Sequence, residues 1–294
     1  MGNFAISAAA QPLSGWLCAS DVDGTLVTAV GAIMPRRNRT AIARFRALGG
    51  IFTIASGRSI PGVVHKMRQL RLLDTPAIVL NGGGVYDCEK RRLLRYHPIP
   101  EDGVKLAFEL CERFPTMQFQ VHMPKSTHFF NVGILNFFGS STDRQPRHFH
   151  RSLADFPQQD WGKCIFYGKP NDLAALKAYC RSLKNPPLSF MESSGVSFEI
   201  VAPGVDKGSA LLELAEILGI DPAHTAGIGN YDNDAGLLAR AAVTAAPSNS
   251  PESFKRLAQH IVSTDSKGAV ADFLEILEHE VLTQNSAKAA ASLQ

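Results

Sequence analysis

The stretch Trp16-Leu17-Cys18-Ala19-Ser20-Asp21-Val22-Asp23-Gly24-Thr25 decides the fold of this chain. It begins as a short apolar run, which is too brief for a helix but suits a buried strand. Residues i and i+2 of an extended chain point the same way, so Asp21 and Asp23 should converge at the strand's carboxyl end. Two carboxylates held close repel each other unless a cation or a shared proton is present. The pair therefore indicates a divalent metal site, an acid/base couple, or both.

Strand and helix patterns alternate after this stretch, which predicts a parallel sheet with crossover helices. The first part of the chain gives a helix at 35–49, a strand at 51–55, a helix at 63–73 and a strand at 77–80. The alternation resumes with a helix at 206–218, a strand at 225–228, a helix to Ala239, a strand at 242–246, a helix from Ser250 through Ile261, and a last helix at 268–282. We expect a flexible tail at 1–14 and a frayed end at 285–294.

A different pattern separates these two parts and predicts an inserted α+β unit. It contains a hairpin at 85–96, helices at 101–114 and 171–183, and short strands at 117–123, 128–138, 163–167 and 196–201. The polar stretch 139–160 is predicted to be the least structured part. Within it, we expect His148 and His150 to lie in a surface loop and not to form a metal-ligand site. The predicted division is 1–83 for the first part of a core, 84–201 for the inserted unit, and 202–294 for the rest of the core.

Composition excludes several classes of protein. Of the 294 residues, 45% are hydrophobic and 19% are charged, as in ordinary soluble globular proteins. The net charge of +3 is too small to predict a nucleic-acid partner, and no run approaches the ~18 apolar residues of a membrane span. The five scattered cysteines indicate reduced thiols. We expect a cytoplasmic protein with neither membrane nor nucleic-acid partner, and the sequence does not predict its oligomeric state.

Four short polar signals lie at or beside the ends of predicted strands, where ligands bind in open α/β sheets. They are the Asp21/Asp23 pair, Ser56-Gly57-Arg58, Lys207, and Asn230 with Asn233 and Asp234. A hydroxyl and N–H groups at a strand-to-helix turn can hold an anion, and carboxylate and carbonyl oxygens suit Mg²⁺. Together these groups describe a phosphoryl-transfer site.

In their order, the four signals resemble the motifs of the haloacid dehalogenase (HAD) superfamily. Ser56-Gly57-Arg58, Asn81-Gly82 and Gly204-Val-Asp-Lys207-Gly208 resemble its Cof-type phosphatases more closely. The resemblance implies an α/β fold: a Rossmann-like parallel-sheet core with a large C2-type cap inserted between the second and third motifs, where 84–201 lies. It also implies a Mg²⁺-dependent phosphatase that hydrolyses a small phosphorylated metabolite, sugar-phosphate-like, through an aspartyl-phosphate intermediate.

The resemblance assigns roles to individual residues. Asp21 would be the nucleophile, and Asp23 would protonate the leaving oxygen and then deprotonate the attacking water. The phosphate would be held by the backbone of Val22, by Ser56, by the Gly57 N–H, by Lys207 and by Asn233. Mg²⁺ would bind the Asp21 carboxylate, the Asp23 backbone carbonyl and Asn230, with Asp234 supporting them.

One departure and two alternatives stand beside this interpretation. The Cof-type fourth motif usually begins Gly-Asp, whereas this chain has Gly229-Asn230, so we expect weaker Mg²⁺ binding than in an Asp-bearing relative. The first alternative is a phosphomutase or phosphotransferase, in which a second hydroxyl takes the phosphoryl group from Asp21. The second is a regulatory protein that binds a phosphorylated ligand without turnover.

Overall fold

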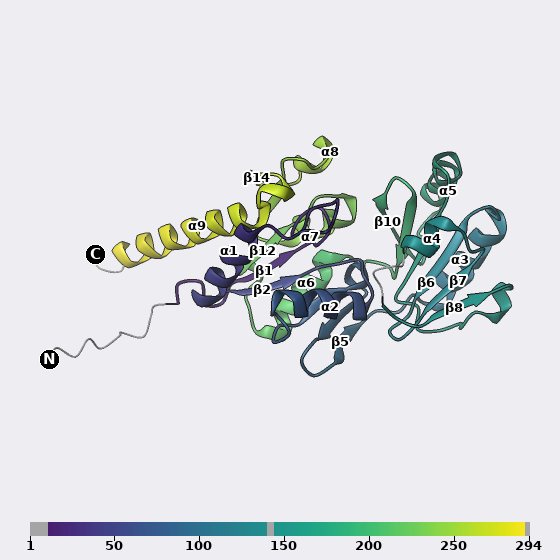
Figure 1. Ribbon diagram of the computed structural model, residues 1–294, viewed down its shortest axis with the longest axis horizontal. Coiled ribbons are helices and arrows are strands. Elements are labelled where there is room, and N and C mark those ends of the chain that lie inside the picture. The colour runs from purple at the N-terminus through teal and green to yellow at the C-terminus, as the bar shows by residue number, and fades with distance from the viewer. Residues whose placement is uncertain (1–10, 140–143, 292–294) are drawn as a thin grey trace.

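A parallel sheet in the order β14-β13-β12-β1-β2 forms the centre of the first lobe of this computed structural model, which describes residues 11–139 and 144–291 (Figure 1). Its strands are β1 (Leu17–Ser20), β2 (Ile51–Ile54), β12 (Thr225–Ile228), β13 (Val243–Pro247) and β14 (His260–Val262). Every pairing in this sheet is parallel, as the alternation of strands and helices predicts. β1 lies between β2 and β12, so the strands that follow it in the chain are added on both of its sides. Ligands of such sheets bind in the crevice at the carboxyl end of the strand where the order reverses.

Helices cover both faces of this sheet. They are α1 (Arg36–Ala47), α2 (Ile60–Leu70), α6 (Lys207–Leu218), α7 (Ala235–Arg240), α8 (Glu252–Lys255) and α9 (Ala269–Ala291). Alternate side chains of β1 enter opposite clusters: Cys18 packs with residues of α1, α2 and α9, whereas Leu17 and Ala19 pack with α6 and α7. The sheet is therefore buried on both sides, which explains the nearly continuous apolar run of its central strand.

A second, mostly antiparallel sheet in the order β10-β11-β9-β6-β7-β8 forms the inserted cap (Figure 1). The cap elements are α3 (Glu101–Arg113), β6 (Gln118–His122), β7 (Thr127–Phe130), α4 (Ile134–Gly139), β8 (Arg147–His150), β9 (Lys163–Tyr167), α5 (Pro170–Ser182), β10 (Ser189–Ser194) and β11 (Ser197–Val201). Along β9, Cys164 and Phe166 belong to the apolar cluster shared with α3 and α5. Lys163, Ile165 and Tyr167 point the other way and line a cavity. The cap therefore buries one face and turns a largely polar face toward the core.

The hairpin of β4 (Gly84–Asp87) and β5 (Arg92–Tyr96) lies within the range that the sequence assigns to the cap. In the structure, β4 pairs with β3 (Ala77–Val79), and Ile78 of β3 bridges Ala55 beside β2. The hairpin also packs on the core clusters through Val85 and Leu93. We therefore propose that the cap begins after Tyr96 and not at residue 84.

Several local predictions are wrong. The run 128–138 is not one strand, because β7 ends at Phe130 and α4 follows. The helix predicted from Ser250 through Ile261 is shorter: α8 begins after Pro251 and ends at Lys255. Ile261 lies in β14, where it is half exposed. His148 and His150 lie in β8 and not in a loop, and the sequence predicts no strand where β10 lies.

The predictions for the chain ends also need correction. Leu13, within the expected tail, is completely buried in the core, and residues 1–10 lie outside the described ranges. Helix α9 continues to Ala291, so the predicted frayed end begins at least seven residues too early. The five cysteines are free and buried. Among residues 11–139 and 144–291, no helix has the length and apolar character needed to cross a bilayer.

Candidate active site

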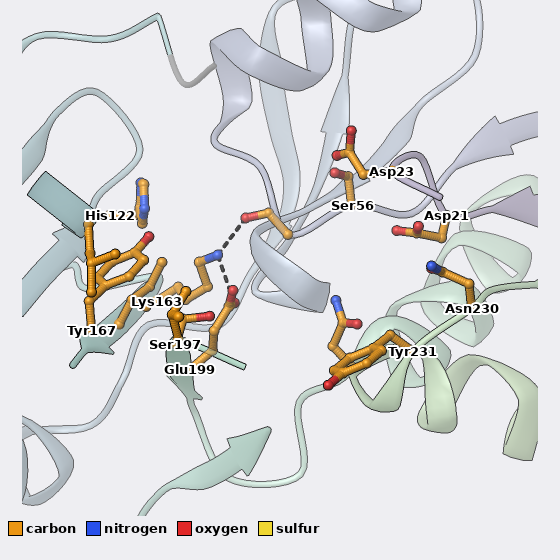
Figure 2. A pocket seen from close by; sticks show the side chains of 15 residues that line it. Asp21, Asp23, Ser56, His122, Lys163, Tyr167, Ser197, Glu199, Asn230 and Tyr231 are labelled. Carbon is orange, nitrogen blue, oxygen red and sulfur yellow. Dashed lines mark hydrogen bonds and ion pairs between the residues drawn. The ribbon is translucent and has the colours of Figure 1, made fainter. Parts of the chain in front are cut away.

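A cavity of about 410 Å³ lies where the carboxyl ends of the core strands face the cap (Figure 2). Six of the predicted site residues line it: Asp21, Asp23, Ser56, Gly57, Asn230 and Asn233. The cap contributes residues that the sequence did not single out, including Lys163, Tyr167 and Glu199. Segments that are more than two hundred residues apart in the chain, such as those of Asp21 and Asn233, therefore meet at one site.

Asp21 follows the last residue of β1 and stands beside Lys207. Its N–H donates to the carbonyl of Ile228 (2.9 Å), which fixes the backbone between β1 and β12. Its Oδ1 accepts a hydrogen bond from Lys207 Nζ (2.6 Å). Burial and the nearby Asp234 carboxylate raise the pKa of Asp21 to about 7, although Lys207 opposes the shift. The carboxylate is thus poorly solvated and paired with a single cation.

Lys207 is completely buried between two carboxylates. It is the first residue of α6, whose N-terminus is capped by Asp206 through the N–H groups of Gly208 and Ser209. Its Nζ donates to Asp21 and to Asp234 (2.5 Å). Burial alone would lower the pKa of Lys207, but the two carboxylates raise it above its ordinary value. The ammonium group therefore stays charged without access to water.

Asp23 is held by Arg58, a residue for which the sequence predicts no separate role. Arg58 binds its carboxylate through two hydrogen bonds, Nη2–Oδ1 at 2.7 Å and Nε–Oδ2 at 3.0 Å. Both aspartates lie beyond the end of β1, in a turn where Gly24 has φ +80°, so their positions are set by the turn and not by an extended strand. The two carboxylates share the cavity, but each pairs with its own cation.

The second predicted motif forms a tight loop against the entrance to the cap. Ser56 Oγ accepts from the Arg58 N–H (3.2 Å), and the Asn81 N–H donates to the Ser56 carbonyl (3.0 Å). A Cβ atom at Gly57 would lie 2.8 Å from Asn81 Oδ1, so any larger residue here would displace the Asn81 side chain. Asn81 Oδ1 also accepts from Asn233 Nδ2 (3.3 Å). Asn81 thus joins two predicted phosphate-binding segments.

Two predicted phosphate-binding residues do not line the cavity. Lys207 is completely buried and bonded to Asp21, and the side chain of Val22 packs in the hydrophobic core. The Val22 carbonyl accepts from the N–H groups of Leu26 and Val27. The side chain of Val22 therefore does not reach the cavity, and a contribution from its backbone stays a prediction.

The oxygen donors around Asn230 fit a hard cation. The side-chain amide of Asn230 lies 3.3 Å from Asp21 Oδ2 and 3.3 Å from the Asp23 carbonyl, and its nitrogen donates to both when the amide takes the orientation that fits these acceptors. Rotating the amide by half a turn would direct its oxygen at the same two oxygens, and a cation would then have three oxygen ligands on one side. Asp234 Oδ2 holds this loop by accepting from the N–H groups of Asn230 and Tyr231. The three predicted metal ligands are thus adjacent, with Asp234 behind them.

Replacing Asn230 with aspartate should strengthen Mg²⁺ binding about tenfold, because a charged ligand replaces a neutral one beside Asp21. Titration calorimetry with MgCl₂ measures this without turnover. Asn230→Ala should weaken binding, and Asn285→Asp, at an exposed position of α9 away from the cavity lining, should leave it unchanged. Equal Mg²⁺ affinity in wild type, Asn230→Asp and Asn230→Ala would show that Asn230 is not a ligand.

Three histidines of the cap contact one another. His128 Nδ1 and His150 Nε2 lie 2.8 Å apart in a hydrogen bond, and His148 stacks on His128. Burial and the two neighbouring imidazoles lower the pKa of His128 to about 4. Within the described part of the chain, no group of three His, Cys, Asp or Glu side chains is arranged to hold a metal ion.

Comparisons with known proteins identify the family and the fold. Residues 18–274 match the haloacid dehalogenase-like hydrolase family. The pyridoxal phosphate phosphatase YbhA of Escherichia coli is 26% identical, over 87% of this chain and 96% of that protein. The 5-amino-6-(5-phospho-D-ribitylamino)uracil phosphatase YcsE of Bacillus subtilis is 25% identical, over 90% and 96%. The solved structure of the HAD subclass IIB sugar phosphatase BT4131 superposes with a TM-score of 0.77 over 90% of this chain and 99% of that one, at 17% identity.

Proposed function

This chain belongs to the haloacid dehalogenase-like hydrolases as a Cof-type phosphatase, and we propose that it hydrolyses a small, sugar-phosphate-like metabolite through an aspartyl-phosphate at Asp21. The observation that carries the proposal is the pairing of Asp21. Its carboxylate lies in the cavity, is buried, and is held by Lys207 on one oxygen while the other faces Asn230. A carboxylate fixed in this way can approach a phosphorus atom without first changing rotamer.

We assign Asp21 as the nucleophile and Asp23 as the proton carrier. Attack by an Asp21 oxygen on phosphorus forms the acyl phosphate, and the substrate oxygen leaves with a proton from Asp23. Asp23 then takes a proton from the water that attacks the acyl phosphate, which releases inorganic phosphate and restores Asp21. Arg58, bound to both oxygens of Asp23, would set the direction of that carboxyl group before substrate arrives.

The remaining predicted residues serve the phosphate and the metal. Ser56, the Gly57 N–H, Asn233 and the backbone of Val22 would bind the nonbridging oxygens, while Lys207 would offset the charge that gathers around Asp21. Mg²⁺, bound by Asp21, the Asp23 carbonyl and Asn230, would neutralise part of the negative charge on the phosphate.

Support for a small substrate comes from the cavity. Its volume of about 410 Å³ falls in the range typical of small-molecule sites. Its cap side offers hydrogen-bonding groups from His122, Tyr167 and Ser197 beside apolar Leu135 and Ile165. The relatives YbhA and YcsE are named for small molecules that each carry a phosphate ester. We therefore place the substrate among small phosphate monoesters.

The test is a screen for release of inorganic phosphate from sugar phosphates, pyridoxal phosphate, flavin-precursor phosphates and nucleotides, with MgCl₂ or with EDTA. We expect turnover of small monoesters that requires Mg²⁺. Added alcohols should not lower the yield of inorganic phosphate, because water is the proposed acceptor. A wild-type protein that binds these esters but releases no phosphate would favour the regulatory alternative, and an alcohol-dependent product would favour a transferase.

A further inference from the structure

A buried ion pair of the cap lines the cavity and contacts the core directly. Lys163 of β9 and Glu199 of β11 lie on the polar face of the cap sheet, with Nζ and Oε2 2.8 Å apart (Figure 2). Their side chains are only 3% and 9% exposed. Removing two charges from water is costly unless the remaining hydrogen-bonding capacity is filled, so their other partners decide whether this arrangement is stable.

Those partners belong to the core. Lys163 Nζ donates to the carbonyl of Gly57 (2.6 Å), and Glu199 Oε2 accepts from the Asn81 side-chain amide. Displacing the cap from the core would break both contacts, and the ion pair would lose these two hydrogen-bonding partners. The ion pair is therefore best satisfied when the cap is docked as it is here.

Both core contacts lead directly to predicted phosphate-binding groups. Gly57 is one of these residues, and Asn81 accepts from a second, Asn233, while its N–H binds the carbonyl of a third, Ser56. Asn81 itself is completely buried and, among the described residues, is not part of the cavity lining. It also adopts a left-handed conformation with φ +57°, which asparagine tolerates better than most residues.

We propose that Lys163, Glu199 and Asn81 form a positioning network that holds the phosphate-binding loops in their binding geometry only when the cap is docked. The inference rests on the proposed function, since it assumes that these loops receive a phosphate. Lys163 and Glu199 come from the cap and Asn81 from the segment that leads into it. Cap position and phosphate affinity are thereby coupled.

The decisive variant is Asn81→Gly. Glycine keeps the left-handed backbone without strain and removes only the amide that joins Glu199 to Asn233. Because Asn81 does not line the cavity, a loss of phosphate affinity in this variant cannot come from a lost direct contact. We expect the Kd of inorganic phosphate, measured by calorimetry in MgCl₂, to rise about tenfold.

Lys163→Met should raise the same Kd by a similar factor, and Lys163→Arg, which keeps a cation near Gly57, should stay within about threefold of wild type. The double variant Lys163→Met/Glu199→Gln removes both charges, so it leaves no unpaired buried carboxylate that could unfold the protein. The control is Lys177→Met: Lys177 also pairs with a cap glutamate, Glu192, but does not line the cavity. Its Kd should equal that of wild type.

The outcomes separate this inference from the proposed function. If wild type releases phosphate from esters while Asn81→Gly binds inorganic phosphate as wild type does, the network has no positioning role and only the inference fails. If Asn81→Gly and Lys163→Met lose affinity while Lys163→Arg and Lys177→Met keep it, the inference stands, whatever the ester screen shows. If wild type neither binds inorganic phosphate nor releases it from esters, both fail.

Discussion

Replacing Asp21 with asparagine should reduce the rate of phosphate release by at least ~10⁴-fold, the scale seen when a covalent nucleophile is removed. The amide oxygen is a poor nucleophile, so no acyl phosphate can form. Asparagine has nearly the same shape and can still accept a hydrogen bond from Lys207. Since burial already raises the pKa of Asp21 to about 7, losing the charge should cost the fold little.

The measurement is single-turnover phosphate release with the best ester of the screen, together with thermal unfolding to confirm the folded state. Asp74→Asn is a matched control, because Asp74 is an exposed aspartate that pairs with Arg46 and takes no part in the site. It should retain wild-type activity. If Asp21→Asn kept more than about a tenth of the wild-type rate, another group would have to be the nucleophile.

Replacing Lys207 with methionine should both inactivate and destabilise the protein. The substitution leaves Asp21 and Asp234 facing each other in a buried place without their shared cation. Breaking a buried ion pair by removing one partner typically costs about 3–5 kcal/mol. We expect the free energy of unfolding in urea to fall by about that amount, and phosphate release to fall to background.

A second substitution separates the two effects. Asp234→Asn added to Lys207→Met removes one of the unpaired carboxylates, so it should recover part of the lost stability but none of the activity. The control is Lys105→Met, since Lys105 pairs with Glu101 at the exposed surface, where ion pairs contribute little. Equal unfolding free energies for Lys207→Met and Lys105→Met would contradict the buried triad as a stabilising element.

The sequence by itself determined the core and most of the site, because both depend on local patterns. Short apolar runs alternating with helical periodicity specify a parallel sheet, and parallel strands bring their carboxyl ends to one edge. Polar residues that follow such strands therefore meet, as Asp21, Ser56 and Asn233 do here. The order of the four motifs was sufficient to predict the fold class and the family.

Only the tertiary structure decided which charged groups pair. Arg58 stood inside a recognised motif, yet its bond to Asp23 depends on the turn at Gly24. Lys163 and Glu199 had no sequence signal at all, since each occupies an alternate position on an ordinary cap strand. Periodicity indicates which face of a strand is buried, but it does not indicate which strands become neighbours or what faces them.

The same limit explains the hairpin of β4 and β5 and the stretch around Asp21. The hairpin has its own strand pattern, but its place in the core depends on pairing with β3, which local sequence does not encode. In Trp16–Thr25 the sequence specified a buried strand followed by two acids at a site. The structure decided that Asp21 pairs with Lys207 and Asp23 with Arg58, because the two cations come from different segments. Lys207 lies at the start of α6, and Arg58 lies between β2 and α2.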